Sequence, residues 1–343
     1  MKFQQPKIFL SGAYPSVQKL KSQQSLVIFD RLLLKNKTFK NWILQFPFSY
    51  AVKSGEELKQ AKNFPKHAEK ILKMASQIDR RPLQIVAVGG GSVGDFAGFV
   101  ASVLYRGVDL VQVPSTWLAA IDSAHGGKTA LNAAGYKNQI GSFHPAKQIY
   151  LIENLLGSQP PARLEEALGE ALKICLLQGG KLWKHFAALK VWNHKNCWNL
   201  LPEMIAAKYF VVQKDPLEKK GYRHILNFGH TLGHVFEGQL KIPHGKAVLL
   251  GLDFSLHWSL QRKILSSANM HSLVQAPILR SVLEKDAVFT SLRKLKNPAQ
   301  ALKADKKRSG QGKIRFIFLA GAGKPRIEEV SIPEVLQEMK RQS

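Results

Sequence analysis

The sequence has only two cysteines, Cys175 and Cys197, among its 343 residues. Two cysteines do not make the disulfide framework of a small secreted protein, and we expect a reducing, cytoplasmic location. The chain also lacks an apolar run near the roughly 20 residues that span a bilayer. Its first ten residues hold two lysines and no sustained apolar core, so they do not resemble a signal peptide. We therefore expect no membrane association.

Acidic residues are scarce, with 24 Asp and Glu against 50 Lys and Arg, and the formal net charge is +26. Such a charge can serve nucleic-acid binding, because counterion release strengthens it. Here the basic residues are spread along the chain, and the densest group, Lys303–Lys313, has only Phe316 and Phe318 nearby, in a predicted strand. We expect no nucleic acid as partner. A basic surface that attracts an anionic small-molecule substrate is favoured.

The length favours two domains. In the first part of the chain, short β-branched runs alternate with helical segments, which predicts βαβ units and a mostly parallel sheet. The predicted strands are Leu26–Asp30, Tyr50–Lys53, Leu83–Val88, Leu110–Pro114 and Ile149–Ile152, and the helical segments are Glu56–Met74, interrupted by Pro65, and Asp95–Tyr105.

The pattern changes after Leu155, where Pro160 and Pro161 punctuate the chain. Apolar residues then follow helical spacing in successive segments. These are Ala162–Leu177, Leu200–Val212, Thr231–Gln239 and Lys246–Leu265, followed by a late strand at Ile314–Leu319, a glycine-rich turn and a helix from Ile332. We predict an α/β, dinucleotide-binding domain over residues 1–155 and a mainly helical metal- and substrate-binding domain over residues 156–343.

A glycine-rich segment lies between a predicted strand and a predicted helix. Gly89, Gly91 and Gly94 have the G-x-G-x-x-G spacing, which lets backbone N–H groups approach a pyrophosphate at a helix N-terminus. A tight turn that needs positive φ is the alternative. No acidic residue follows at the end of a second strand about 20 residues on, as the standard fingerprint requires. The segment predicts a phosphate or dinucleotide site that differs from the standard Rossmann site.

Three of the 11 histidines are concentrated in one short stretch. His230 and His234 are four residues apart, on one face of a helix, and His244 follows at a predicted loop-to-helix junction. Glu170, on a predicted helix with Lys173, offers an oxygen ligand. Two imidazoles and a carboxylate with an open position are typical of catalytic zinc. The spacing does not decide which two histidines bind, and hydrogen-bonded core histidines are the alternative.

A lysine-rich loop is predicted over residues 122–132. Gly126–Thr129 resembles the end of a P-loop, but the upstream glycine and the preceding strand are missing, which excludes nucleoside triphosphate binding at this motif. Lys137 and Asn138 follow closely. Lysines and amides on glycine-rich turns suit a phosphate or carboxylate, and a solvated charged loop is the alternative.

Taken together, these segments resemble the 3-dehydroquinate synthase family of sugar phosphate cyclases, in order and near its spacing from about residue 50 to 320. The matching motifs are Gly89–Asp95, Tyr105–Gly107, Pro114–Thr116, Asp122–Asn132, Lys137–Asn138, Glu170 with Lys173, Asp215 with Glu218, Arg223–His234 and His244–Gly245. The resemblance implies that family's fold and a homodimer.

The resemblance also implies the site residues. Zinc would be bound by Glu170, His230 and His244, with His234 left in the substrate pocket, and cobalt suits the same ligands. Contacts to NAD would come from Asp30, Glu56, Lys59, Gly90, Gly91, Ser92, Val93, Asp95, Ser115, Thr116, Asp122 and Lys137. The substrate's phosphate, carboxylate and hydroxyls would be held by Arg106, Lys128, Asn138, Lys173, Lys208, Arg223, Asn227 and Lys307, or Lys306 in place of Lys307.

The implied reaction converts 3-deoxy-D-arabino-heptulosonate 7-phosphate into 3-dehydroquinate and phosphate, in the shikimate pathway to chorismate and the aromatic amino acids. In this family NAD oxidises a ring hydroxyl to a ketone, which acidifies the neighbouring C–H so that phosphate leaves by β-elimination. The hydride then returns, the ring opens and an intramolecular aldol step closes the carbocycle. NAD leaves unchanged, so the enzyme is a lyase.

The sequence departs from the family pattern in several places. Lys246 stands where an acidic residue is usual and would change the basicity of a metal ligand, and His125 replaces a small or aliphatic residue near the pocket. Ser115 replaces a customary threonine and keeps its hydroxyl. The stretch Asp215–Arg223 is one residue longer than typical, which would displace Arg223. None of these changes removes a predicted metal ligand.

Three alternatives remain. A related cyclase would act on another heptulose phosphate, but Arg223 and Asn227 favour a substrate with a carboxylate. A metal-dependent alcohol dehydrogenase of related fold would accumulate NADH. A basic binding protein on an inactive scaffold would show salt-dependent nucleic-acid affinity without zinc.

Overall fold

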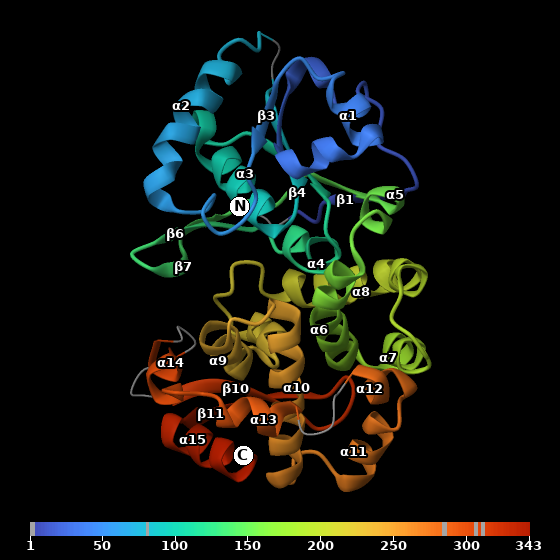
Figure 1. Ribbon diagram of the computed structural model, residues 1–343, viewed down its shortest axis with the longest axis vertical. Coiled ribbons are helices and arrows are strands. Elements are labelled where there is room, and N and C mark those ends of the chain that lie inside the picture. Colours follow the sequence, from blue (N-terminus) through green and yellow to red (C-terminus); the bar gives the residue numbers. More distant parts are fainter. Residues whose placement is uncertain (1–3, 80–81, 283–286, 305–307, 310–312) are drawn as a thin grey trace. The chain divides into compact units, whose positions relative to one another are not determined.

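The computed structural model describes residues 4–79, 82–282, 287–304, 308–309 and 313–343 (Figure 1). The chain forms two compact units, residues 1–163 and 164–343, which divide a few residues after the predicted boundary. The first is an α/β unit and the second is mainly helical, as predicted. Among the described residues, no helix combines the length and apolar character needed to cross a membrane.

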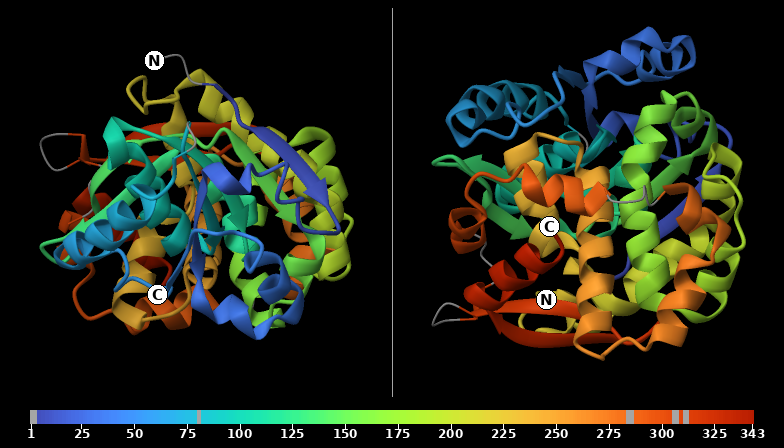
Figure 2. Two further views of the ribbon diagram at one scale, coloured as in Figure 1. Left: turned by 90° about the horizontal axis from the view of Figure 1, so that it is seen from above. Right: turned by 60° about the horizontal axis from the view of Figure 1, so that its bottom comes forward.

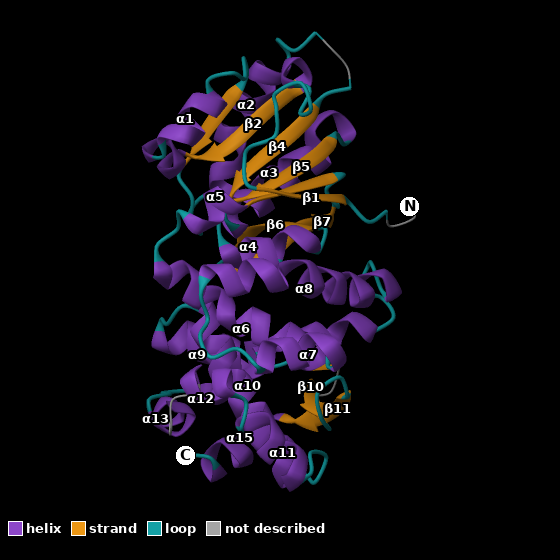
Figure 3. Ribbon diagram, turned by 90° about the vertical axis from the view of Figure 1, so that its right-hand side faces the viewer, coloured by secondary structure: helices purple, strands orange, loops and turns teal. Residues whose placement is uncertain are grey.

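The first unit is built on a six-stranded parallel sheet with the order β1-β8-β5-β4-β2-β3 (Figure 3). All five predicted strands are present, and β2 is buried along its whole length, as expected for a parallel strand covered on both faces. The edge strand β1 was missed because most of its residues are exposed or half-buried. The strands are Lys7–Ser11 (β1), Ser25–Asp30 (β2), Ser49–Val52 (β3), Gln84–Gly89 (β4), Asp109–Pro114 (β5) and Gln148–Ile152 (β8).

The helices of this unit differ from prediction at their starts. The predicted helix from Glu56 begins only at Phe64, where Pro65 occupies the first turn and a proline costs no hydrogen bond. The helix after the glycine turn begins earlier than predicted, at Gly91 rather than Asp95. The helices are Lys37–Ile43 (α1), Phe64–Ala75 (α2), Gly91–Val103 (α3), Trp117–Ile121 (α4) and Glu153–Gly157 (α5).

The predicted lysine-rich loop is wrong over its second half, because Lys128–Ala133 forms a strand, β6, paired antiparallel with Tyr136–Phe143, β7. Ala134 and Gly135, both at positive φ, make the two-residue connection, which matches strand twist. Four consecutive β6 residues from Thr129 are buried, so this segment belongs to the fold rather than to a solvated loop.

The second unit packs helices around a small sheet of Arg308–Ser309 (β9), Lys313–Leu319 (β10) and Pro325–Ser331 (β11). Strand β10 packs against α10 in this unit (Figure 2). The core there includes Trp258 and Phe318, whose rings are in edge-to-face contact. The largely exposed β11 was not predicted. The helices are Pro161–Gln178 (α6), Gly180–Ala187 (α7), His194–Lys214 (α8), His230–Leu240 (α9), His244–Gln261 (α10), Ser267–Val274 (α11), Pro277–Val282 (α12), Ala287–Arg293 (α13), Pro298–Ala304 (α14) and Ile332–Arg341 (α15).

Candidate active site

The glycine turn joins β4 to α3 with its backbone closely packed. A Cβ on Gly89 would lie 2.5 Å from the Val93 Cβ, and one on Gly90 would lie 3.1 Å from the Thr116 Cγ2. Gly90 is the N-cap of α3, and no side chain caps this helix. The first-turn N–H groups of a helix lack intrahelical partners and favour negative charge. The turn therefore fits the pyrophosphate of a dinucleotide.

The topology of the sheet points to the same place. The chain leaves β2 toward β3 but leaves β4 toward β5, on the opposite side, so the strand order reverses between β2 and β4. Ligands of open α/β sheets bind outside the carboxyl ends of the strands at such a reversal. Asp30 ends β2 there, and its carboxylate accepts the Leu32 N–H at 3.0 Å, which makes it the cap of a 3-10 turn. Its predicted contact to ribose stays a prediction.

The other predicted cofactor residues lie in the first unit, and some of them contact this turn. The Ser92 hydroxyl accepts the Gly55 N–H at 3.0 Å, and the Ser115 N–H donates to the Gly89 carbonyl. Thr116 caps α4 through its hydroxyl. Gly91 opens α3, Val93 is buried within it, Asp122 precedes the short 3-10 turn Ser123–His125, and Lys137 lies exposed on β7.

Lys59 links two elements of the first unit, α3 and β7. Its buried ammonium lies 2.5 Å from the Asp95 Oδ2 on α3 and 2.5 Å from the Asn138 Oδ1 on β7. The Asn132 amide donates to the Glu56 carboxylate at 2.7 Å and accepts the Asn138 N–H at 2.9 Å. Burial raises the pKa of Asp95, and the Lys59 ammonium opposes that shift. The network ties the glycine helix to the β6–β7 hairpin.

Replacing Lys59 with methionine should lower the free energy of unfolding by about 1–3 kcal/mol, because the Asp95 carboxylate loses its cation in a largely buried place. Lys62→Met, at an exposed position on the same segment, is the matched control and should stay within about 0.5 kcal/mol. Urea titrations of both variants give the comparison. Equal midpoints for Lys59→Met and the parent protein would contradict the role given to Lys59.

Two other segments of the first unit contain residues singled out in the sequence: Arg106 and Lys128 as predicted substrate contacts, and His125 as a departure from the family pattern. Tyr105, Arg106 and Gly107 all have positive φ, and such strained backbone clusters at functional sites. Arg106 and Lys128 are exposed. His125 is buried, with its Nε2 2.7 Å from the Ala120 carbonyl oxygen, so its imidazole is part of the packed interior.

In the second unit, α6, α9 and α10 bring three ligand-type side chains together. The Glu170 Oε1 lies 3.1 Å from the His230 Nε2 and 3.2 Å from the His244 Nε2. One ligand atom of each residue falls within 4.8 Å of the others. The exposed His234 lies outside this group, its ring centroid 5.5 Å from that of His230. The geometry thus selects two of the three histidines.

The hydrogen bonds of the two imidazoles show that this cluster fits a metal ion. The His230 Nδ1 lies 3.1 Å from the Phe228 carbonyl oxygen, and the His244 Nδ1 lies 2.8 Å from the Glu237 Oε2. Both partners only accept, so each Nδ1 carries a proton, and a neutral ring then points its Nε2 lone pair at the Glu170 carboxylate. Lone pairs that face one another need a cation between them, and this N, N, O donor set suits zinc or cobalt.

The close approach of Glu170, His230 and His244 also shifts the pKa values of the cluster. Burial alone would raise the pKa of Glu170, but the Lys173 ammonium and the two histidines hold it well below its usual range. Burial alone would lower the pKa of His244, but hydrogen bonds to Glu170 and Glu237 raise it to about 9. A metal ion at this cluster would therefore compete with a proton for His244, and metal affinity should rise with pH.

Glycines beside the ligands allow the three helices to approach this closely. A Cβ on Gly245 would lie 1.8 Å from the Glu166 carbonyl oxygen of α6, and one on Gly251 would lie 1.9 Å from the Gly229 carbonyl oxygen before α9. Gly245 directly follows His244 in the chain, and Gly229 directly precedes His230. Backbone contact at these crossings sets the distances between the ligand side chains.

Three buried cations belong to the same unit. Lys173 forms an ion pair with the Glu170 Oε2, and Lys208 and Arg223 are 5% and 3% exposed. Buried cations are rare unless a partner or an anionic ligand compensates them. The partly exposed Asn227 ends the 3-10 turn Tyr222–Asn227. The predicted substrate residue Lys307 lies outside the described residues.

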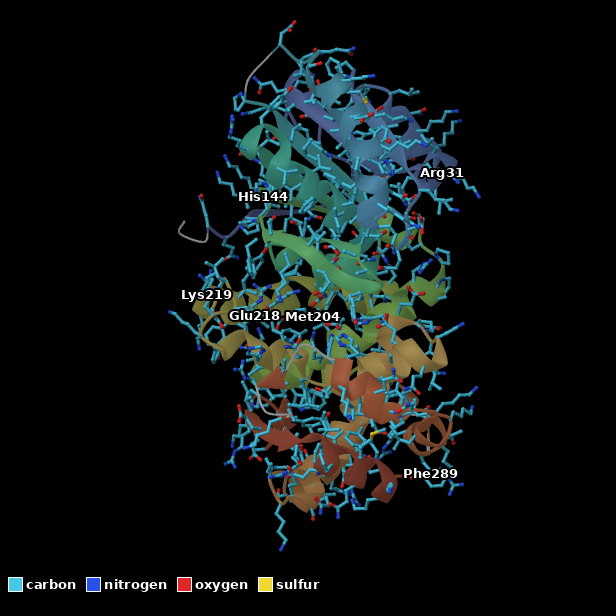
Figure 4. The ribbon with its side chains drawn as sticks, turned by 90° about the vertical axis from the view of Figure 1, so that its left-hand side faces the viewer. Arg31, His144, Met204, Glu218, Lys219 and Phe289 are labelled. Carbon is cyan, nitrogen blue, oxygen red and sulfur yellow. The ribbon has the colours of Figure 1, made fainter. Side chains whose placement is uncertain are left out.

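Hydrogen bonds to Asp215 order the loop before Arg223. The Asp215 carboxylate accepts the backbone N–H groups of Lys219 at 2.9 Å and of Arg223 at 3.3 Å. Burial would raise the pKa of Asp215, but these and neighbouring backbone hydrogen bonds lower it. Glu218 and Gly221 absorb the turn at positive φ, and Figure 4 labels Glu218 and Lys219 on this loop. The Arg223 side chain that follows is buried, and the extra residue relative to the family stays a prediction.

One residue near the metal ligands was not predicted. Glu237 follows His230 by seven residues, which is two helical turns, so both lie on one face of α9. That spacing was the available signal. Lys246, which was predicted to affect a metal ligand, is exposed on α10.

Comparison with known proteins places the chain in a family. Residues 49–166 match the family described as 3-dehydroquinate synthase N-terminal, and residues 167–308 match 3-dehydroquinate synthase C-terminal. A 3-dehydroquinate synthase of Leptospira interrogans is 35% identical over 327 residues, which are 92% of this chain and 88% of the relative. That of Alkaliphilus metalliredigens is 34% identical over 273 residues, 75% of this chain and 72% of the relative.

A solved structure supports the fold. The 2-deoxy-scyllo-inosose synthase crystallised with carbaglucose-6-phosphate, NAD+ and Co2+ superposes with a TM-score of 0.78, over 97% of this chain and 96% of that one. Its sequence is 22% identical, so this likeness concerns the fold alone. The sequence matches extend over both units, and the chain belongs to the 3-dehydroquinate synthase family.

Proposed function

We propose that this protein is a 3-dehydroquinate synthase that converts 3-deoxy-D-arabino-heptulosonate 7-phosphate into 3-dehydroquinate and phosphate in the shikimate pathway, with NAD and zinc or cobalt. The observation that carries the proposal is the convergence of Glu170, His230 and His244, with Lys173 paired to the carboxylate, in a chain of this family. We further propose a homodimer. The free, buried thiols of Cys175 and Cys197 support a cytoplasmic location.

Glu170, His230 and His244 would hold the metal. A zinc or cobalt ion bound there supplies a Lewis acid for substrate hydroxyls. The Lys173 ammonium lowers the pKa of Glu170, so the Glu170 carboxylate is ionised at neutral pH and can bind a metal ion. His234 lies on the same helix with an exposed imidazole, and a histidine can accept or release a proton near neutral pH.

The glycine turn would hold NAD by its pyrophosphate, with Asp30, Glu56, Lys59, Asp95, Ser115, Thr116, Asp122 and Lys137 as further contacts. NAD supplies a reversible hydride acceptor and is not consumed. Lys59 and Asp95 neutralise each other at the start of α3, so the helix end keeps its preference for an anion.

The anionic groups of the substrate call for cations. In the second unit, Lys208, Arg223 and Asn227 are assigned to a carboxylate and hydroxyls, because a planar guanidinium binds a carboxylate bidentately. In the first unit, Arg106, Lys128 and Asn138 are assigned to phosphate and hydroxyls. The burial of Arg223 supports a substrate with a carboxylate over a heptulose phosphate that lacks one, such as sedoheptulose 7-phosphate.

Release of inorganic phosphate from 3-deoxy-D-arabino-heptulosonate 7-phosphate tests this function. With NAD at a small fraction of the substrate concentration, we expect many turnovers, loss of activity after chelation, and recovery with zinc or cobalt. Sedoheptulose 7-phosphate, assayed in parallel, should release at least tenfold less phosphate. Steady accumulation of NADH, or preference for sedoheptulose 7-phosphate, would overturn the assignment.

A further inference from the structure

Glu237 makes a contact that the proposed roles leave unused. It lies on α9, and its Oε2 is 2.8 Å from the Nδ1 of His244 on α10. Both side chains are largely sheltered, with 23% of Glu237 and 32% of His244 exposed. Because the two nitrogens of an imidazole lie on different edges of the ring, Glu237 contacts His244 on the edge away from Glu170.

The chemistry of this contact determines which nitrogen of His244 is free. A carboxylate only accepts, so the His244 Nδ1 donates its proton to Glu237 and the Nε2 keeps its lone pair for a metal ion. The outer partner of His230 is the neutral Phe228 carbonyl, 3.1 Å from its Nδ1. The two histidines thus differ at their Nδ1 atoms, because a carboxylate faces the Nδ1 of His244 and a neutral carbonyl faces that of His230. An anionic partner at Nδ1 makes an imidazole a stronger donor through its Nε2.

We propose that Glu237 is a positioning residue that orients His244 and raises its affinity for the metal ion, an inference that rests on the proposed metal site. Lys246, two residues after His244, is exposed on α10, whereas the carboxylate in contact with the His244 Nδ1 comes from α9. Glu237 is not itself a ligand, because the convergent group consists of Glu170, His230 and His244 among the described residues.

The test is the zinc affinity of Glu237→Leu, Glu237→Gln and the parent protein, measured by competition with a chromophoric chelator. We expect the zinc dissociation constant of Glu237→Leu to be 10- to 100-fold higher than that of the parent, because this variant loses both the hydrogen bond and the charge. Glu237→Gln keeps an acceptor oxygen and should lose less, about three- to tenfold. Visible spectra of the cobalt-loaded variants report changed ligand geometry independently of turnover.

Each outcome separates this inference from the proposed function. Zinc affinity of Glu237→Leu within twofold of the parent would overturn the role of Glu237 alone. A parent protein that binds no zinc would overturn the metal site and this inference together. If the parent binds zinc most tightly and Glu237→Leu least tightly, but no phosphate is released, the role of Glu237 is supported. Only the assignment of the substrate is then overturned. Thermal unfolding of the metal-free variants shows that each is folded.

Discussion

Replacing Glu170 with glutamine is expected to abolish tight zinc binding and to destabilise the metal-free protein at the same time. One carboxylate oxygen, the proposed metal ligand, lies near the Nε2 atoms of His230 and His244, and the other oxygen pairs with the buried Lys173. Removing one partner of a buried ion pair costs roughly 3–5 kcal/mol, because the remaining charge is left in a poorly solvated place. We expect phosphate release to fall by at least about 1,000-fold, equivalent to some 4 kcal/mol of activation free energy.

A double variant separates the two effects. Glu170→Gln combined with Lys173→Met removes both charges, so the free energy of unfolding should recover most of its loss. Zinc affinity and phosphate release should not recover, because the ligand is still missing. Urea unfolding in the presence of a chelator and zinc titration measure the two quantities. A double variant that regains zinc binding, or a single variant as stable as the parent, would show that Glu170 does not have both roles.

Gly245→Ala is expected to have the second large effect, although it adds only one methyl group. The new Cβ would lie 1.8 Å from the Glu166 carbonyl oxygen, 2.5 Å from its carbonyl carbon and 3.0 Å from its Cα. All three are backbone atoms, so α6 and α10 must separate. Overpacking of this kind costs about 3 kcal/mol or more at its upper end. Because His244 precedes Gly245 and Glu170 lies one turn after Glu166, zinc affinity should fall by at least about tenfold.

Gly238→Ala is the matched control on α9. A Cβ there meets nothing within 4 Å. Alanine is favoured over glycine within a helix by roughly 0.5–1 kcal/mol, so this variant should be slightly more stable than the parent. Thermal unfolding and zinc titration of both alanine variants measure the difference. If Gly245→Ala behaves like Gly238→Ala, the close crossing of α6 and α10 does not hold the metal ligands in place.

Local sequence patterns predicted most of the elements that support the candidate site. The buried strands β2 and β4 are short apolar runs, and α6 and α10 carry apolar residues at helical spacing, so each element is encoded within its own segment. The glycine turn was recognisable because its strand and helix flank it directly. The hairpin β6–β7 was not recognisable, since the lysine of its first strand and the glycines before it are also typical of a loop. The burial of Thr129 and its neighbours depends on contacts with α3.

The sequence by itself determined which residues are candidates for the metal site: three histidines, one glutamate and a lysine three residues after it. Only the tertiary structure decided among them, by bringing His244 to Glu170 and leaving His234 outside. It also added Glu237, whose partner lies on another helix. The physical reason is that periodicity within a helix records which face a side chain occupies, whereas a distance between helices depends on how their backbones cross, here at Gly245 and Gly251.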